Sequence, residues 1–386
     1  MDRIAQLRAL LPAMLPEVVR QALREPGAEI ESWSCDPIHM PVRSGFTAGL
    51  YRVSGLAHLI GQQALWSVVL KVIHRPDGTT AYDDPRGTPY WRREACAYES
   101  GLLDNLPGGL AAPRCFAVMA RPDQTVFVWL EEIADHFGDR WPLDWYGVAA
   151  RHIGQFNGAY LTDQPVPAEP WLAVEPLRGW LVHQADSVKL IERPEIWQHP
   201  LLRRLFPLPI TVRLLRLWSE REAFLAVLSR LPQTLCHFDA THHNLLPMPA
   251  SAGRERTVAI DWESVGIAAV GEDAGILGSA PFIRGTLDPA DLPSLQERVF
   301  AGYLEGLHDA GWYGDRRVVR LGYAANAALR WVFGAPSLRA IIDKERWVRE
   351  EQRWGRSMEE LLEARAALTY ALLDLADEAR ALMDRV

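Results

Sequence analysis

The segment His237–Asn244, HFDATHHN, brings three histidines, an aspartate and an asparagine together in eight residues. A zinc site would need three or four ligands that converge on one point, but the adjacent His242 and His243 would tend to face different directions. A polar turn, in which Asp239 and Asn244 bind nearby backbone groups, explains the composition without any chemistry. The spacing of the polar residues favours a third interpretation, a catalytic loop.

His-x-Asp followed five residues later by Asn is the spacing of a kinase catalytic loop, in which the Asp addresses the acceptor hydroxyl and the Asn holds a metal ion. Such a loop needs a second aspartate, at the end of a strand, as the main magnesium ligand. The apolar run Thr257–Ile260 predicts a short strand, and Asp261 ends it seventeen residues after Asn244. Together the two features indicate phosphoryl transfer far better than the loop alone.

A lysine should also project from a strand toward the nucleotide phosphates. Lys71 lies in the otherwise apolar run Val68–Ile73, and a buried ammonium group needs an anionic partner. We expect Glu94 to be that partner, because it lies in the stripe of its predicted helix that should face the sheet. Glu99 lies on the same helix and is the alternative. A lysine that extends along an edge strand into water is the interpretation without chemistry.

The elements around these residues change in character near residue 135. Short β-rich runs bounded by turn residues come first, interrupted by one helix at about Tyr90–Leu103, which predicts a small antiparallel sheet carrying one helix. Helical periodicity dominates after residue 140, apart from a β-rich interlude at Leu235–Ile260 in which Ser251–Arg256 is expected to be a hairpin loop. The predicted fold is therefore α+β. The expected strands are Leu50–Val53, Trp66–Ile73 and Thr125–Leu130, and the expected parts are a helical segment at 1–27, a β-rich lobe at 28–130 and a mostly helical lobe at 131–386.

Composition excludes several classes of protein. The 386 residues carry a formal net charge of −8, which offers no basic surface to a nucleic-acid backbone. Four widely separated cysteines suggest neither a thiolate zinc site nor a disulfide framework. The N-terminus predicts an amphipathic helix rather than a signal peptide, and no stretch is apolar enough to span a bilayer. We therefore expect a cytoplasmic protein with no membrane or nucleic-acid partner.

The runs CHFDATHHNLL and VAIDWESVGIAAVGEDAG resemble the Brenner-type catalytic segment of the aminoglycoside phosphotransferase family and its relatives, the choline, homoserine and fructosamine kinases. The resemblance extends from about Ser44 to beyond Asp273, and the catalytic segment is its specific part. It implies a two-lobe, protein-kinase-like fold, with a β-rich lobe that binds nucleotide phosphates and a helical lobe that holds the catalytic loop and the acceptor.

The same resemblance implies a role for each matching residue. Asp239 would orient or deprotonate the acceptor hydroxyl, and Asn244 and Asp261 would bind magnesium. Lys71 would contact the α- and β-phosphates of ATP or GTP, and Glu94 would position Lys71. The remaining implied roles are loop support by His237 and Asp273, and purine recognition by the backbone of Trp129–Ile133, which includes Glu131 and Ile133.

Two departures from the family pattern are visible, and one nearby residue has an open role. Phe238 stands between His and Asp, where the family commonly has a small residue, which should alter packing without changing the chemistry. The phosphate-covering loop Ser44–Gly49 has only Gly45 and Gly49 rather than a full GxGxxG, although two glycines still let backbone amides approach phosphate. Glu263 follows Asp261 by two residues, and it could be a second magnesium ligand or a surface carboxylate.

The acceptor site is the least defined. Glu305 and Asp309 are four residues apart and could share a helical face toward an ammonium-bearing ligand, or could equally form a solvated face. Trp331 lies in the region where an acceptor wall is expected. We therefore expect a magnesium-dependent phosphotransferase that uses ATP or GTP and a small-molecule hydroxyl acceptor, an antibiotic or a similar polar natural product. A metabolic kinase for choline-like or sugar substrates and a catalytically silent binding module are the alternatives, and the sequence leaves the nucleotide and the oligomeric state open.

Overall fold

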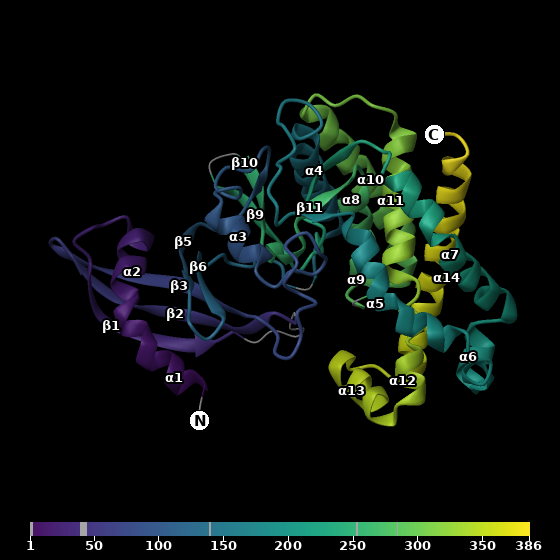
Figure 1. Ribbon diagram of the computed structural model, residues 1–386, viewed down its shortest axis with the longest axis horizontal. Helices are drawn as coiled ribbons and strands as arrows, with labels where there is room; N and C mark the ends of the chain where they lie inside the picture. The colour runs from purple at the N-terminus through teal and green to yellow at the C-terminus, as the bar shows by residue number, and fades with distance from the viewer. Residues whose placement is uncertain (1–2, 39–44, 139, 252–253, 284) are drawn as a thin grey trace. The chain divides into compact units, whose positions relative to one another are not determined.

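The computed structural model describes residues 3–38, 45–138, 140–251, 254–283 and 285–386 (Figure 1). The chain forms two compact units. Unit 1 comprises Met1–Leu106 and Ala111–Ala134, and unit 2 comprises Pro107–Leu110 and Asp135–Val386. Ser44, predicted to belong to the phosphate-covering loop, lies outside the described residues. Across the described ranges, no helix is both long and apolar enough to cross a membrane.

Unit 1 is built on a five-stranded antiparallel sheet with the strand order β1-β2-β3-β6-β5. The three predicted strands are present as β2, β3 and β6, whereas the outer strands β1 and β5 were not predicted. The burial of β1 does not alternate, and Cys35 is its only buried residue, so it lacks the period-two signal of a half-buried strand. The elements are α1 (Arg3–Leu10), η1 (Leu11–Ala13), α2 (Leu15–Leu23), β1 (Glu29–Pro37), β2 (Thr47–Leu59), β3 (Gln62–His74), α3 (Arg93–Glu99), β5 (Cys115–Ala120) and β6 (Thr125–Glu131), with β4 (Leu110–Ala111) where the units join.

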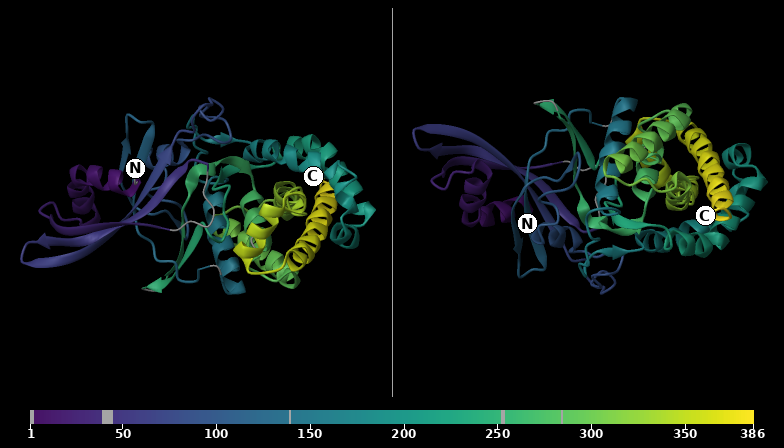
Figure 2. Two further views of the ribbon diagram at one scale, coloured as in Figure 1. Left: turned by 90° about the horizontal axis from the view of Figure 1, so that it is seen from below. Right: turned by 90° about the horizontal axis from the view of Figure 1, so that it is seen from above.

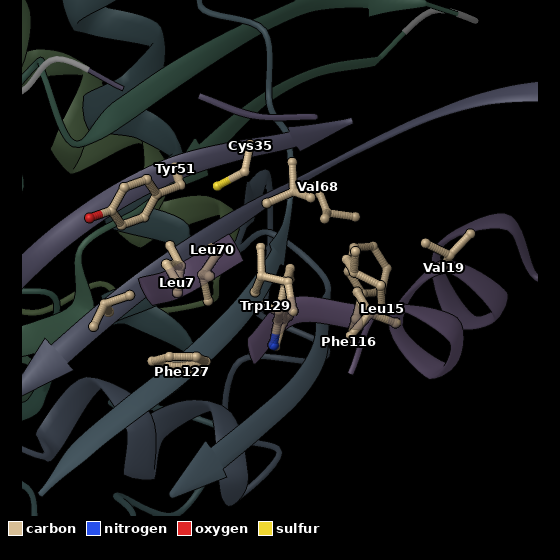
Figure 3. Packing of buried hydrophobic residues seen from close by; sticks show 14 of the residues in the cluster. Leu7, Leu15, Val19, Cys35, Tyr51, Val68, Leu70, Phe116, Phe127 and Trp129 are labelled. Atoms are coloured by element: carbon tan, nitrogen blue, oxygen red, sulfur yellow. The ribbon is translucent and has the colours of Figure 1, made fainter. Parts of the chain in front are cut away.

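The N-terminal helices supply one side of the core of unit 1. Leu7 and Leu15, from α1 and α2, are buried in one cluster with Val68 and Leu70 of β3 (Figure 3). Each such side chain contributes on the order of 1.5–3 kcal/mol when it is fully buried. Because successive side chains of a strand point to opposite faces, Lys71 lies on the other face of the sheet.

The helix α3 is shorter than predicted. The pattern predicted a helix over Tyr90–Leu103, but α3 spans only Arg93–Glu99. Gly101 follows it with a φ of 75°, the left-handed conformation in which glycine commonly ends a helix. The apolar residues beyond Gly101 therefore belong to a turn rather than to a further helical turn.

Unit 2 is mostly helical and contains a small sheet of order β7-β11-β8 and the β9–β10 hairpin. The helices α4 and α10 pack against each other, as do α11 and α14 (Figure 2). The elements are α4 (Leu143–Ala159), β7 (Ala173–Val174), α5 (Pro176–Ile191), η2 (Ile196–Gln198), α6 (Pro200–Leu205), α7 (Leu208–Leu228), β8 (Gln233–Cys236), β9 (Leu245–Ser251), β10 (Arg254–Ala259), η3 (Trp262–Ser264), β11 (Gly266–Ala269), α8 (Glu272–Leu277), α9 (Ala280–Ile283), η4 (Pro289–Asp291), α10 (Leu292–Asp309), α11 (Arg316–Trp331), α12 (Leu338–Ile342), α13 (Lys344–Trp354) and α14 (Met358–Met383).

The hairpin within the catalytic segment is more regular than predicted. The sequence indicated a loop over Ser251–Arg256, but Arg254 pairs with Ser251 and Arg256 pairs with Met248. Residues 254–256 therefore belong to β10. This strand ends at Ala259, two residues before Asp261.

Candidate active site

Lys71 and Glu94 form a buried ion pair inside unit 1. The Lys71 Nζ atom lies 2.5 Å from Glu94 Oε2, and their side chains are only 8% and 3% exposed. Glu99 instead pairs with Arg92 at 3.0 Å. The structure therefore selects Glu94 over Glu99 as the partner of Lys71. The pair lies on the face of the sheet opposite to α1 and α2, where α3 lies.

Gly45 and Gly49, the glycines of the predicted phosphate-covering loop, differ in their surroundings. Among the described residues, a Cβ atom at Gly45 would have no neighbour within 4 Å, whereas a Cβ atom at Gly49 would lie 2.6 Å from the ring of Tyr51. Gly49 is thus required by packing within β2. Gly45 is the position where the backbone could be approached by another group without a side chain in the way.

The end of β6 was predicted to read the purine edge. The Glu131 backbone N–H donates to the carbonyl oxygen of Arg114 at 2.9 Å, and the Glu131 carboxylate accepts from the Arg114 N–H at 3.2 Å. Both groups therefore already have partners within unit 1. Ile133 follows the strand in irregular structure and is half-buried.

In unit 2, the catalytic loop is closed by its own polar groups. The Asn244 amide nitrogen Nδ2 donates to Asp239 Oδ2 at 2.7 Å and to the Asp239 carbonyl oxygen at 3.0 Å. The Thr241 N–H donates to the same carbonyl at 2.7 Å. Because Nδ2 faces Asp239, the Oδ1 atom of Asn244 is the atom that can face a ligand.

The loop is tied to the end of the hairpin by two further bonds. The Ile260 N–H donates to the Asn244 carbonyl oxygen at 2.8 Å, which sets Asp261 one residue beyond this contact. The His237 Nε2 atom lies 3.0 Å from the Ile260 carbonyl oxygen, and His237 Nδ1 accepts from the Asp239 N–H at 3.2 Å. With Nδ1 accepting, Nε2 is the protonated nitrogen of a neutral ring. His237 thus links the Asp239 loop to the strand that precedes Asp261.

Asp273, in the first turn of α8, holds the start of the loop. Its Oδ2 atom accepts from the His237 N–H at 2.9 Å, and its Oδ1 atom accepts from the Phe238 N–H at 2.8 Å. Asn157 of α4, which the sequence did not single out, donates to the same carboxylate at 3.3 Å. Burial raises the pKa of Asp273, while the hydrogen bonds donated to its carboxylate act against the shift. The hydrogen-bonding pattern is the one expected for a residue that braces the loop.

The neighbouring Glu272 is also buried. Its carboxylate accepts from the Ala269 N–H and from Asn326 Nδ2, both at 2.9 Å. Burial nevertheless raises the pKa of Glu272 from 4.5 to about 7. Asp273, which holds the loop, and the neighbouring Glu272 are thus two carboxyl groups whose ionised forms are disfavoured by burial.

Two residues of the site have left-handed backbone. Phe238 has a φ of 60° and Asp261 a φ of 64°. A bulky residue at positive φ carries strain on the order of 1–3 kcal/mol, and glycine would carry none. This explains why a small residue is expected between His237 and Asp239. The Phe238 ring is buried and lies 5.1 Å from the guanidinium carbon of Arg330.

Arg330, at the end of α11, is a site residue that the sequence analysis missed. Its Nη2 atom donates to Asp239 Oδ1 at 2.9 Å, and its side chain is only 1% exposed, against 23% for Asp239. Burial lowers the pKa of Arg330, and the carboxylate of Asp239 opposes that shift. A signal was present, because a lone arginine in the apolar run YAANAALRWVFG must be buried and therefore paired.

The donor set fits magnesium better than zinc. Within the described parts of the chain, no group of three or more His, Cys, Asp or Glu side chains is placed to hold a metal ion. Both ring nitrogens of His237 are already engaged. An amide oxygen of Asn244 and the carboxylate of Asp261 are hard oxygen donors, and magnesium typically takes one or two such protein ligands beside substrate phosphates. The short helix η3 begins directly after Asp261. Glu263 is its second residue and is half-buried.

The acceptor-site candidates lie in different surroundings. The Asp309 carboxylate accepts from Arg151 Nε at 2.6 Å and from Gln155 Nε2 at 2.8 Å, so it is committed to α4. Glu305 is exposed on the same helix and acts electrostatically on Arg151. Trp331, in contrast, directly follows Arg330 and lies beside the Asp239 cluster.

No family model matches this sequence. No curated protein matches it either. Solved structures do match over most of the chain. A mutant of aminoglycoside 2'-phosphotransferase-IIIa in complex with GDP gives a TM-score of 0.53 at 16% identity, covering 96% of this chain and 100% of that one. The GDP and kanamycin complex of APH(2")-IIIa gives a TM-score of 0.52 at 14% identity, covering 94% and 98%. The chain therefore has the α+β, protein-kinase-like fold of the aminoglycoside phosphotransferases, as the sequence predicted.

Proposed function

We propose that this chain is a magnesium-dependent phosphotransferase that moves the γ-phosphate of ATP or GTP to a hydroxyl group of a small molecule. The observation that supports this best is the closed loop in which Asn244 holds the Asp239 carboxylate at 2.7 Å while its main chain pairs with Ile260, beside Asp261. A polar turn has no physical need for this convergence of a base and two oxygen ligands. The shared fold adds support.

In this proposal Asp239 accepts a hydrogen bond from the acceptor hydroxyl and takes its proton as the oxygen attacks the γ-phosphorus. A new P–O bond forms, the bond between the γ-phosphorus and the bridging oxygen breaks, and the nucleoside diphosphate leaves. Positioning and charge neutralisation dominate this reaction, so the protein mainly has to hold its groups still. Arg330 and Asn244 do this for Asp239, one on each carboxylate oxygen.

Asn244 Oδ1 and the Asp261 carboxylate would hold the magnesium ion, which when bound neutralises charge on the nucleotide phosphates. Lys71 would contact the α- and β-phosphates, with Glu94 fixing its ammonium group. These assignments follow from the chemistry of the donors and from the ion pair inside unit 1.

The first test is a thermal shift with Mg-ATP and Mg-GTP on the wild type and on Asp261→Asn, with Asp309→Asn as a matched exposed control. A ligand at a hundred times its dissociation constant stabilises the native state by about 2.7 kcal/mol, which is a visible rise of the midpoint. We expect a shift for the wild type and for Asp309→Asn, and a much smaller one for Asp261→Asn. If neither nucleotide shifts the wild type, the catalytic proposal is wrong.

Two alternatives remain as outcomes of the next step. A catalytically silent module would bind nucleotide without releasing ADP or GDP in any acceptor screen. A metabolic kinase would release it with choline-like or sugar acceptors and not with antibiotics. A screen of both acceptor groups, read out as diphosphate release, separates these cases.

A further inference from the structure

The side chains next to Asp239 in unit 2 are aromatic and cationic. The guanidinium carbon of Arg330 lies 4.0 Å from the ring centre of Trp180 and 5.0 Å from that of Trp331. The two indoles meet edge to face, with their ring centres 5.7 Å apart. Both tryptophans are half-buried. A ligand that reaches Asp239 along this side would lie against indole rings, since the Arg330 guanidinium is itself buried and paired with Asp239.

A pocket in unit 2 begins about one helical turn from this cluster. Gln184 lies one turn after Trp180 on α5, and Phe333 and Gly334 follow Trp331 by two and three residues. All three residues line a cavity of about 270 Å³. This volume is close to the lower end of the range for small-ligand pockets. A cavity of nearly ligand size thus begins about one helical turn from Trp180 along α5.

The pocket carries excess positive charge. Arg339 and Arg346 line it, and both are exposed; Arg346 acts electrostatically on Glu350, and Arg339 acts on Asp186. Its one acidic lining residue, Glu350, is already held by Arg365 at 2.9 Å and by the Trp354 indole N–H at 3.1 Å. Paired arginines favour carboxylate and phosphate groups, which their fork of N–H donors matches.

The acidic residues that could have bound an ammonium group lie elsewhere. Neither Glu305 nor Asp309 lines the pocket, and Asp309 is held by Arg151 and Gln155. A polycationic aminoglycoside in this pocket would therefore meet two guanidinium groups and one carboxylate that Arg365 already holds. Like charges repel, so the pocket disfavours this class of acceptor relative to an anionic one.

We propose that this pocket binds the acceptor, and that the acceptor carries a carboxylate or phosphate group for Arg339 and Arg346 together with a ring that packs against Trp180 and Trp331. This inference rests on the proposed function, because it takes Asp239 as the group that receives the acceptor hydroxyl. The substrate class is thus an anionic, ring-bearing hydroxyl compound rather than an amino sugar.

The test uses matched probes that differ in one substituent: phenyl glucoside, phenyl glucuronide, phenyl glucoside 6-phosphate and phenyl glucosaminide, with kanamycin as a polycation. Dissociation constants are measured by ligand-observed NMR, with and without Mg-AMP-PNP. We expect the carboxylate or the phosphate probe to bind at least about tenfold more tightly than the ammonium probe, as a charge-assisted hydrogen bond implies. The comparison of the two anionic probes identifies the preferred group.

The variant Arg339→Ala/Arg346→Ala should abolish this preference. Arg349→Ala is the matched control, because Arg349 lies on the same helix, is exposed and pairs with Glu345 at 3.6 Å outside the pocket. Tighter binding of kanamycin or the ammonium probe, no binding of any probe, or a preference that survives the double substitution would each overturn the inference. Nucleotide binding in the same sample separates this result from a failure of the proposed function, which predicts that binding independently.

Discussion

Arg330 and Asp239 form an ion pair with its closest atoms 2.9 Å apart, although 91 residues separate them in the sequence. The pair is asymmetric, since the guanidinium is buried between aromatic rings while part of the carboxylate remains exposed. Each partner therefore has a different energetic consequence when it is removed.

Removal of the carboxylate leaves a buried cation without its partner. We expect Asp239→Ala to lower the free energy of unfolding by about 3 kcal/mol, the low end of the range for breaking a buried pair. Arg330→Met should cost less, because the exposed carboxylate can be hydrated and methionine packs well against indole rings. The double variant should be more stable than Asp239→Ala alone. Urea unfolding of the four proteins measures the cycle, and additive effects would contradict the pairing.

The catalytic role of Asp239 has a kinetic signature. Asp239→Asn keeps the size of the side chain and one acceptor oxygen but removes the base, so we expect turnover to fall by about 10²- to 10⁴-fold. Nucleotide affinity should change little, because Asp239 does not contact the nucleotide in the proposed mechanism. Steady-state diphosphate release and calorimetric nucleotide titration measure the two quantities. Turnover close to that of the wild type would remove Asp239 from the mechanism.

The left-handed backbone of Phe238 predicts an unusual order of stability. Both Phe238→Ala and Phe238→Gly lose the buried ring, a change that typically costs about 3–5 kcal/mol. At a φ of 60° glycine is relaxed whereas alanine is strained, so Phe238→Gly should be the more stable variant by about 1 kcal/mol. At positions with negative φ, alanine is normally the more stabilising of the two residues. Denaturant unfolding measures the free energy of unfolding of the two variants. A more stable alanine variant would show that the strain is absent.

Glu272 should make stability depend on pH. Its folded pKa of about 7 lies above the usual 4.5, so the folded state holds the proton more tightly than the unfolded state. Stability should fall as the pH rises from about 4.5 to 7, by up to about 3 kcal/mol, and then level off. Glu272→Gln cannot ionise. If the Asn326 amide flips, the new amide N–H can donate to Asn326 Oδ1, which is buried and has no hydrogen-bond partner among the described residues.

We therefore expect Glu272→Gln to gain stability relative to the wild type between pH 5 and pH 8. Free energies of unfolding measured at several pH values in this range provide the comparison. A difference that is the same at every pH would mean that Glu272 has the same protonation state in the folded and the unfolded wild-type protein, and would contradict the prediction.

The candidate catalytic loop could be located from the sequence because its residues are close together along the chain. Asp239, Asn244 and Asp261 form a spaced pattern, and the same local logic led from the helical stripe to Glu94. The structure pairs Glu94 with Lys71 and leaves Glu99 to Arg92. Sequence reasoning succeeded where a contact depends on the period of a single helix or on one loop.

Contacts between distant elements could not be predicted in this way. Arg330 reaches Asp239 from α11, and Asn157 reaches Asp273 from α4, so neither is near its partner in the sequence. Asp309 was a candidate for binding the acceptor, but α10 packs on α4 and the Asp309 carboxylate pairs with Arg151. The strain at Phe238 was missed for another reason, because side-chain identity does not reveal a φ angle that tertiary structure imposes.

The bond between the Ile260 N–H and the Asn244 carbonyl oxygen has a consequence for folding. It joins two residues only sixteen positions apart, so closing the loop between them has a small entropic cost. Contacts of such short range tend to form early, whereas the 91-residue separation of Arg330 and Asp239 requires α11 to be in place. We therefore expect a nascent chain to form the β9–β10 hairpin first. The ion pair between Asp239 and Arg330 should form only when α11 has docked.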